Sequence, residues 1–145
     1  MTRFTFDAAA DASPVWSGDG RRIFFSSNRD TGKLNIYQKI SSGAGSDELL
    51  LRTDGNAFAD DWFSGKDGEL LLYETEVPKS RFDLWVLPLT GERKPYPYLE
   101  TEFNETHSQF SPDGRFVAYV SGRVGAGGGL RPELSGHRWQ VANLD

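Results

Sequence analysis

The sequence predicts an all-β fold, a partial β-propeller built from four-stranded antiparallel blades. The first observation is a turn motif, an aromatic residue and serine followed by Asp-Gly, which is complete at residues 16–20 and 110–114 and stretched by two residues at 62–68. The second is the spacing, because an offset of 48 residues relates Gly20 to Gly68. The third is the alternation of apolar residues after each Asp-Gly, with few helix signals. Such a repeat is typical of a propeller blade.

Each motif predicts a β-hairpin, because Asp-Gly can adopt the positive backbone angles of a two-residue turn. The longer copy predicts a bulge or a wider turn. We expect one partial propeller domain over residues 1–145, with blades at about 12–52, 58–100 and 106–142. The expected strands are 14–17, 21–27, 33–40 and 47–52 in the first blade, 59–64, 69–75, 82–89 and 96–100 in the second, and 108–111 and 115–121 in the third.

The two ends of the chain depart from the repeat. Residues 3–6 align with the last strand of a blade, so we expect an orphan strand there. Residues 122–136 are irregular and glycine-rich, and 137–141 form a plausible last strand, so the third blade lacks a good third strand. A reading-frame error or a genuine divergent loop would each produce this pattern. Two complete blades are fewer than the roughly four to eight of a closed ring, which indicates a fragment of a larger protein.

Composition excludes several classes of protein. The net charge of -5, with Lys and Arg scattered among Asp and Glu, argues against a nucleic-acid surface. No apolar run approaches the roughly 18 residues of a spanning helix, so we expect no membrane insertion by this segment. The absence of cysteine excludes a disulfide scaffold, a thiolate zinc site and a cysteine nucleophile. Open blade edges favour self-association.

No residue pattern predicts catalytic, cofactor-binding or metal-binding residues. His107 and Ser108 are adjacent in an expected strand and point to opposite faces, so they do not form a hydrolase pair. The glycines at 125–129 lack the spacing of a phosphate-binding loop. Asp60 and Asp61, with Glu74 and Glu76, lack the dense spacing of a calcium loop and are expected to form a solvated acidic rim.

The motif residues themselves have structural roles in this interpretation. We expect Asp19, Asp67 and Asp113 to bond backbone amides in their turns, and Trp16, Trp62 and Phe110 to pack between blades. Partner contacts are instead expected in the aromatic and acidic loops around 58–61 and 96–107. The candidate contact residues are Phe58, Asp60, Asp61, Tyr96, Tyr98 and His107. Replacing Asp61 or Tyr98 with alanine is expected to leave folding intact and to weaken partner binding.

The repeat as a whole resembles a known family. Trp-Ser-x-Asp-Gly-x-x-apolar-x-aromatic, followed by Ser-Asn-Arg-Asp and Asn-Ile-Tyr, is similar to the WD-like propeller repeat of the TolB type over residues 3–121. Residues 26–30, 83–87 and 103–107 look similar to propellers that lie C-terminal to bacterial Ser/Thr protein kinases. The same repeat occurs in propellers that gate prolyl oligopeptidase-type hydrolases. The family carries no catalytic residue on these motifs.

The resemblance implies a non-catalytic segment of a larger bacterial protein that binds a protein or senses a small ligand. The alternative is a regulatory or gating propeller of a multidomain enzyme, a Ser/Thr kinase or a prolyl oligopeptidase-type hydrolase, whose catalytic domain is missing from this chain. In either case we expect no cofactor, no nucleic-acid partner, and no esterase, peptidase or kinase turnover by the chain alone. A periplasmic or other extracytoplasmic location is favoured by the resemblance only.

Overall fold

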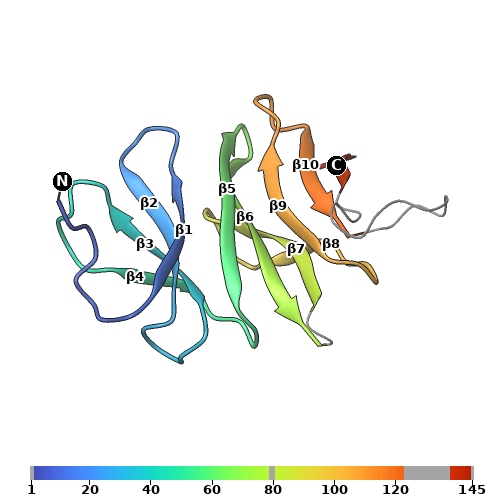
Figure 1. The fold of residues 1–145 in the computed structure, drawn as a ribbon. Coiled ribbons are helices and arrows are strands. Elements are labelled where there is room, and N and C mark those ends of the chain that lie inside the picture. The colour runs from blue at the N-terminus through green and yellow to red at the C-terminus, as the bar shows by residue number, and fades with distance from the viewer. Residues whose placement is uncertain (1, 79–80, 123–137, 145) are drawn as a thin grey trace.

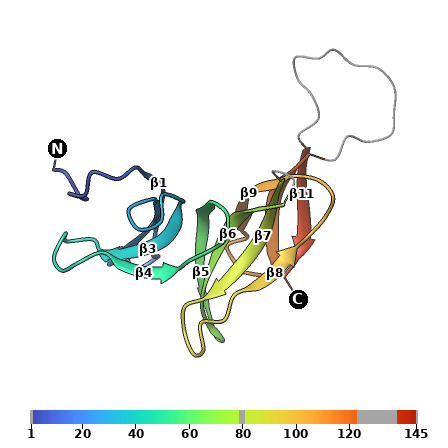
Figure 2. The same cartoon turned by 90° about the horizontal axis from the view of Figure 1, so that it is seen from below.

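The computed structural model describes residues 2–78, 81–122 and 138–144, which form three antiparallel sheets and no helix. The order of strands is β1-β2-β3-β4 in the first sheet, β5-β6-β7-β8 in the second and β11-β10-β9 in the third. Figure 1 shows the sheets side by side in chain order, from blue to red. Figure 2 shows the same order from below. The expected partial propeller, with two full blades and an incomplete third, is confirmed. Within the described ranges no helix has the length and apolarity needed to cross a membrane.

The strands agree closely with those expected for the first two blades. The first sheet consists of Asp11–Trp16 (β1), Arg22–Ser27 (β2), Asn35–Ile40 (β3) and Glu48–Leu51 (β4). The second consists of Ala57–Gly65 (β5), Gly68–Val77 (β6), Arg81–Pro88 (β7) and Tyr96–Leu99 (β8). The third consists of Glu105–Phe110 (β9), Phe116–Ser121 (β10) and Arg138–Asn143 (β11).

The two complete turn motifs close longer hairpins than the two-residue turn expected. In the first, the Ser17 backbone N–H donates to the Arg22 carbonyl at 3.0 Å, so the loop is formed by residues 18–21. The Ser17 hydroxyl accepts the Arg22 N–H at 2.9 Å, and the Asp19 carboxylate accepts the Arg21 N–H at 3.0 Å. These side-chain oxygens therefore accept bonds from two backbone N–H groups at the end of the loop. Gly20 supplies the left-handed backbone with φ of 69°.

The third motif repeats these bonds, and the second does not. The Ser111 N–H donates to the Phe116 carbonyl at 2.8 Å, and Asp113 accepts the Arg115 N–H at 3.2 Å. The amide-bonding role expected of Asp19 and Asp113 is therefore present, whereas the described residues contain no such bond at Asp67. In the stretched copy the strands continue to a paired Gly65 and Gly68. The expected wider turn is wrong, because the two extra residues lengthen the ladder and Lys66-Asp67 forms a two-residue turn.

A bulge interrupts the first strand of each sheet. The register shifts once between Ala12 and Val15, once between Ala59 and Asp61, and once in β9 opposite Ala118 and Val120. Ser13 and His107 adopt left-handed φ angles of 51° and 54° at the bulges in β1 and β9. An extra residue bends the bulged strand and increases its twist.

The second sheet is buried on both faces. Leu71 and Tyr73 of β6 face the first sheet, whereas Leu72 between them faces the third, as the alternation of a strand requires. We call the space between sheets one and two the first seam and that between sheets two and three the second seam. The buried apolar residues of the first seam are Val15, Phe24, Ile36, Ala57, Ala59, Leu71, Tyr73, Leu87 and Leu89. Those of the second seam are Leu72, Val86 and Val117, with Leu70, Tyr98, Phe110 and Leu144 packed against them.

An asparagine anchors the crossing from each sheet to the next. Asn56 accepts a hydrogen bond from the Leu34 N–H at 3.0 Å through its side-chain oxygen. Asn104, 48 residues later, accepts one from the Phe82 N–H at the same 3.0 Å. Both bonds join the start of one sheet to the third strand of the preceding sheet. The sequence repeat is therefore also a repeat of hydrogen bonds.

Three expectations about the ends of the chain need correction. Residues 3–6 form no strand, because no described strand pairs with them; the Phe4 carbonyl instead accepts a bond from the Lys39 ammonium at 3.1 Å. The segment expected to be the last strand of the third blade is instead the third strand of that blade, since Arg138–Asn143 pairs with β10. Trp16 does not pack between sheets and is 58% exposed, because no described sheet precedes it. The irregular glycine-rich segment, from residue 123 onward, lies outside the described residues.

Candidate functional site

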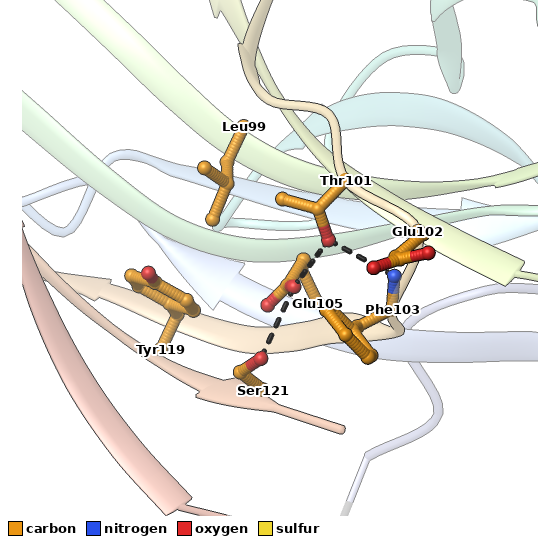
Figure 3. A pocket seen from close by; sticks show the side chains of 7 residues that line it. All are labelled: Leu99, Thr101, Glu102, Phe103, Glu105, Tyr119 and Ser121. Carbon is orange, nitrogen blue, oxygen red and sulfur yellow. Dashed lines mark hydrogen bonds between the residues drawn. The ribbon is translucent and has the colours of Figure 1, made fainter. Parts of the chain in front are cut away.

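A cavity of about 530 Å³ opens at the second seam, between the β8–β9 loop and strand β10. Figure 3 shows its lining side chains, which come from the end of β8, the loop, the start of β9 and the end of β10. They are Leu99, Thr101, Glu102, Phe103, Glu105, Tyr119 and Ser121. The volume lies in the range of small-molecule binding sites, roughly 300–1,000 Å³.

Glu105 is the central charged group of this cavity and is 1% exposed. Its Oε1 accepts hydrogen bonds from the Thr101 hydroxyl at 2.7 Å and from the Ser121 hydroxyl at 3.1 Å (Figure 3). Its Oε2 is buried and has no hydrogen-bond partner among the described residues. Buried polar atoms are almost always paired in folded proteins, and an unpaired carboxylate oxygen is costly. The arrangement therefore leaves Oε2 as an unpaired acceptor in a residue that lines the cavity.

Local structure fixes the position of Glu105. It is the first residue of β9 and pairs in register with Ser121, the last residue of β10. The loop before it is braced by Thr101, whose hydroxyl accepts the Phe103 N–H at 3.0 Å while donating to Glu105. Asn104 ties the same loop to β7. The carboxylate thus projects from a strand end that is paired with β10 on one side and is held to β7 by the Asn104 side chain.

A second carboxylate lies behind this site. Asp83 of β7 is 6% exposed, and its Oδ1 has no hydrogen-bond partner within the described part of the chain. Burial raises the pKa of Asp83, an N–H bond from Thr101 opposes the rise, and the charges of Glu100 and Glu105 add to it. Asp83 shares its face of β7 with Trp85 and Leu87, which pack in the first seam, so its charge acts on Glu105 from that side of the second sheet.

Aromatic rings form the remaining wall. Tyr119 is buried at 7% exposure and Phe103 is half-buried. Tyr98, which packs against the neighbouring core, has a pKa raised to about 12, first by burial and then by Tyr119. A carboxylate beside ring faces in a partly dry cavity is suited to bind an organic cation.

Three of the four acidic residues predicted to form a solvated rim instead bond the third sheet to the second, whereas Glu76 accepts bonds from Asn56. The Asp60 carboxylate accepts the Ser108 N–H at 2.9 Å and the Ser108 hydroxyl at 2.6 Å. Asp61 accepts the Phe110 N–H at 2.9 Å, and Glu74 accepts the His107 N–H at 2.8 Å. The solvated rim was wrong because strand β9 packs directly on these side chains.

Burial changes the acidity of two of these groups. It raises the pKa of Asp60 to about 6, although the bonds from Ser108 oppose the rise. It raises the pKa of Glu74 to about 7, with a further contribution from the charge of Asp60. The pair therefore titrates near neutral pH at the contact between sheets.

The candidate contact residues lie in strands rather than loops and do not form one surface. Phe58 of β5 packs edge-on against Phe82, with ring centroids 5.9 Å apart. Tyr96 of β8 is 41% exposed, and His107 of β9 is exposed at its bulge. Because Asp61 bonds β9 and Tyr98 packs in the core, we now expect their replacement by alanine to lower stability as well. A contact role for these six residues stays a prediction.

Sequence reasoning missed Glu105, Thr101 and Ser121. One signal was available, since Glu105 stands 48 residues after Ala57, a fully buried core residue at 0% exposure. Because a charged residue stands where the preceding repeat has a buried alanine, the packing between sheets is expected to differ at this position. Among the described residues no group of three or more His, Cys, Asp or Glu is placed to bind a metal ion.

Two solved structures share this fold. The chain is similar to a putative TolB from Agrobacterium tumefaciens, with a TM-score of 0.74 and 20% identity over 91% of this chain and 42% of that one. It is also similar to TolB from Acinetobacter baumannii, with a TM-score of 0.66 and 16% identity over 91% of this chain and 29% of that one. No family model and no curated protein matches the sequence. The fold is that of a TolB-type β-propeller, and the chain spans less than half the length of these two neighbours.

Proposed function

We propose that this chain is a non-catalytic binding segment of a β-propeller, and that it takes a segment of a protein partner at the cavity of the second seam. The observation that carries the proposal is the buried Glu105 carboxylate, which lines the cavity and has one oxygen without a partner among the described residues. The rigid sheets supply a frame, and function on such a frame depends on a local site.

The first seam supports the proposal by contrast. It is built from the equivalent strands and anchored by the equivalent asparagine, Asn56. At the position of Glu105, however, it has Ala57, which belongs to a continuous apolar core. A carboxylate is therefore not needed to join two sheets of this kind. A costly buried charge that the fold does not require is better explained by recognition than by packing.

The TolB-type fold supports a protein partner, and an extracytoplasmic location belongs to the same proposal. The finer likeness to kinase-associated propellers, and the alternative of a regulatory or gating propeller, stay predictions. No described feature favours either one over a simple binding segment.

A displayed library of random peptides, selected on the folded chain, tests this function. We expect enriched peptides that bind saturably and shift the amide signals of residues 99–105 and 119–121. Thr101→Trp, which places an indole in the cavity, should abolish binding, whereas Lys94→Trp on an exposed loop should not. A failure to enrich any peptide, or binding that maps away from the second seam, would refute the proposal. Esterase, peptidase or kinase turnover above background would refute its non-catalytic part.

A further inference from the structure

A carboxylate occupies the same register position in the first and third sheets. Asp11 of β1 pairs with Ser27 of β2, and Glu105 of β9 pairs with Ser121 of β10. Each pair lies at the far end of the hairpin that the turn motif closes. In the second sheet the position belongs to Ala57, opposite Thr75, and carries no charge.

In the first sheet this carboxylate binds a guanidinium. Arg29 Nη2 lies 3.0 Å from Asp11 Oδ1, and Arg29 Nε donates to the Ser27 hydroxyl at 2.9 Å. The guanidinium carbon lies 5.3 Å from the ring centre of Phe25. Burial acts to raise the pKa of Asp11, yet hydrogen bonds from Ser27, Thr5 and Arg29 and the arginine charge bring it below its usual value. Asp47 is paired with the same guanidinium, and the ring centre of Tyr37 lies 4.9 Å from its carbon, so two carboxylates, a hydroxyl and two rings form the guanidinium site.

The third sheet contains equivalents of three of these five groups. Glu105 stands for Asp11, Ser121 for Ser27, and Tyr119, two residues before Ser121, for Phe25. Thr101 adds a second hydroxyl to the carboxylate. Oε2 of Glu105 has no partner among the described residues, and Glu105, Tyr119 and Ser121 all line the adjoining cavity.

We propose that the cavity of the second seam is a receptor for a guanidinium group, which binds the Glu105 carboxylate and lies against the ring of Tyr119. A guanidinium is planar, presents a fork of N–H donors to a carboxylate and is weakly hydrated, so it suits a partly dry cavity. Contact with an aromatic face adds to the attraction. An ammonium ion is a compact, strongly hydrated point charge, so it loses more hydration free energy when it enters the cavity. This inference rests on the proposed binding function and names the chemistry of its ligand.

Titration of the full chain with methylguanidinium, followed by amide shifts, tests this inference. We expect saturable shifts at residues 101, 105 and 121, weaker binding of methylammonium, and no binding of uncharged methylurea. Glu105→Gln should weaken binding at least tenfold. Glu92→Gln, a matched control that removes the same charge from an exposed loop residue outside the cavity, should change it less than twofold. Equal effects of the two variants, or unsaturable shifts over the acidic surface, would overturn the proposal.

Two sources could supply the guanidinium, a ligand in solution or an arginine of this chain. In the sequence, Arg123 follows Ser121 at the spacing by which Arg29 follows Ser27, and Arg123 lies outside the described residues. Binding of methylguanidinium to the unaltered chain identifies an external ligand. Binding that appears only in Arg123→Gln identifies the chain's own arginine as the occupant. If neither the unaltered chain nor Arg123→Gln binds methylguanidinium, the proposed receptor is contradicted.

Two further controls keep the outcome clear. If Glu105→Gln does not fold, the preference of the unaltered chain for methylguanidinium over methylurea still decides the question. If peptides bind the second seam but neither form binds methylguanidinium, only this inference fails. If no peptide binds there while methylguanidinium does, the proposed protein-binding function fails and the receptor stands.

Discussion

At the scale of single residues, position in the repeat does not fix a side chain's surroundings. Trp62 lies so close to Gly18 of the preceding sheet that a Cβ on that glycine would approach its ring to 2.5 Å. Phe110 packs against Phe63 of its preceding sheet with ring centroids 5.5 Å apart. Trp16 has the same place in the repeat but no described sheet on that side, and it is exposed.

This difference predicts unequal costs for two similar substitutions. Trp62→Ala should lower the free energy of unfolding by roughly 3 kcal/mol, because it empties part of the first seam. Trp16→Ala should change it by less than about 0.5 kcal/mol, as is usual for an exposed side chain. Urea denaturation of both variants measures the two values. Similar losses in the two variants would show that Trp16 is covered in solution.

The raised pKa values of Asp60 and Glu74, about 6 and about 7, predict a stability that depends on pH. A raised pKa means that the folded chain binds the proton more tightly than the unfolded chain, so this contribution is complete below about pH 4 and is lost as the pH rises through 6 and 7. The free energy of unfolding should therefore fall by on the order of 3 kcal/mol between pH 5 and pH 8, at about 1.4 kcal/mol per pKa unit.

The control for this pH dependence is the double variant Asp60→Asn, Glu74→Gln, which should show a flatter profile in the same urea titrations. Subtracting one profile from the other removes the contributions of titratable groups outside the pair. The nearby Asp61 and His107 are present in both proteins. Parallel profiles would show that the pair does not titrate near neutral pH.

At the scale of elements, side chains that bond the backbone determine how hairpins and sheets connect. Ser17 and Ser111 bond the backbone at the ends of their loops, and the two asparagines join each sheet to the one before it. Of these, Asn56 carries an additional bond, because its side-chain amide donates to Glu76 at 3.0 Å. The links between sheets are thus local hydrogen bonds as well as apolar contacts.

Replacing the asparagines should therefore weaken the links between sheets. Asn104→Ala leaves the Phe82 N–H without its acceptor and should cost about 1–2 kcal/mol of unfolding free energy. Asn56→Ala loses two bonds and should cost more than Asn104→Ala. Calorimetry of both variants, with the exposed Gln109→Ala as control, measures the order. A cost for Asn104→Ala no greater than that of the control would contradict the proposed link.

The sequence was sufficient for the strands of the first two sheets because alternation and turn residues are local signals. It did not reveal the length of the hairpin loops, since the Ser17 hydroxyl and the Asp19 carboxylate replace bonds that a two-residue turn would make. It did not reveal the acidic contacts either, because the partners of Asp60 lie 48 residues away on another sheet. The Glu105 cavity also depends on packing between sheets, which no local pattern encodes.

At the scale of the whole molecule, the three sheets form layers with two seams of unequal size. The first seam has a large apolar core, whereas the second combines a small core with buried carboxylates and a cavity. In repeat proteins each unit is stabilised mainly by its neighbours. The third sheet therefore has less apolar burial to resist local opening than the second.

Hydrogen exchange should report this inequality. Amides of β6 and β7, in the sheet covered on both faces, should exchange slowest, and those of β10 should exchange faster by at least tenfold. Exchange followed by NMR at a pH near 6 resolves the strands. Equal protection of β6 and β10 would show that the second seam is as stable as the first.

The central claim is that Glu105 makes the cavity of the second seam a negatively charged binding site, and the absence of cysteine allows a direct test. Leu99→Cys places a single cysteine in the cavity wall. Its rate of modification is then measured with two methanethiosulfonate reagents, one carrying a cationic trimethylammonium group and the other an anionic sulfonate group. The cationic reagent should react faster. The ratio of the two rates should fall about tenfold with Glu105→Gln but not with Glu92→Gln, because only the buried charge of the cavity acts at short range in a low dielectric. A ratio that is the same in all three proteins would contradict the account.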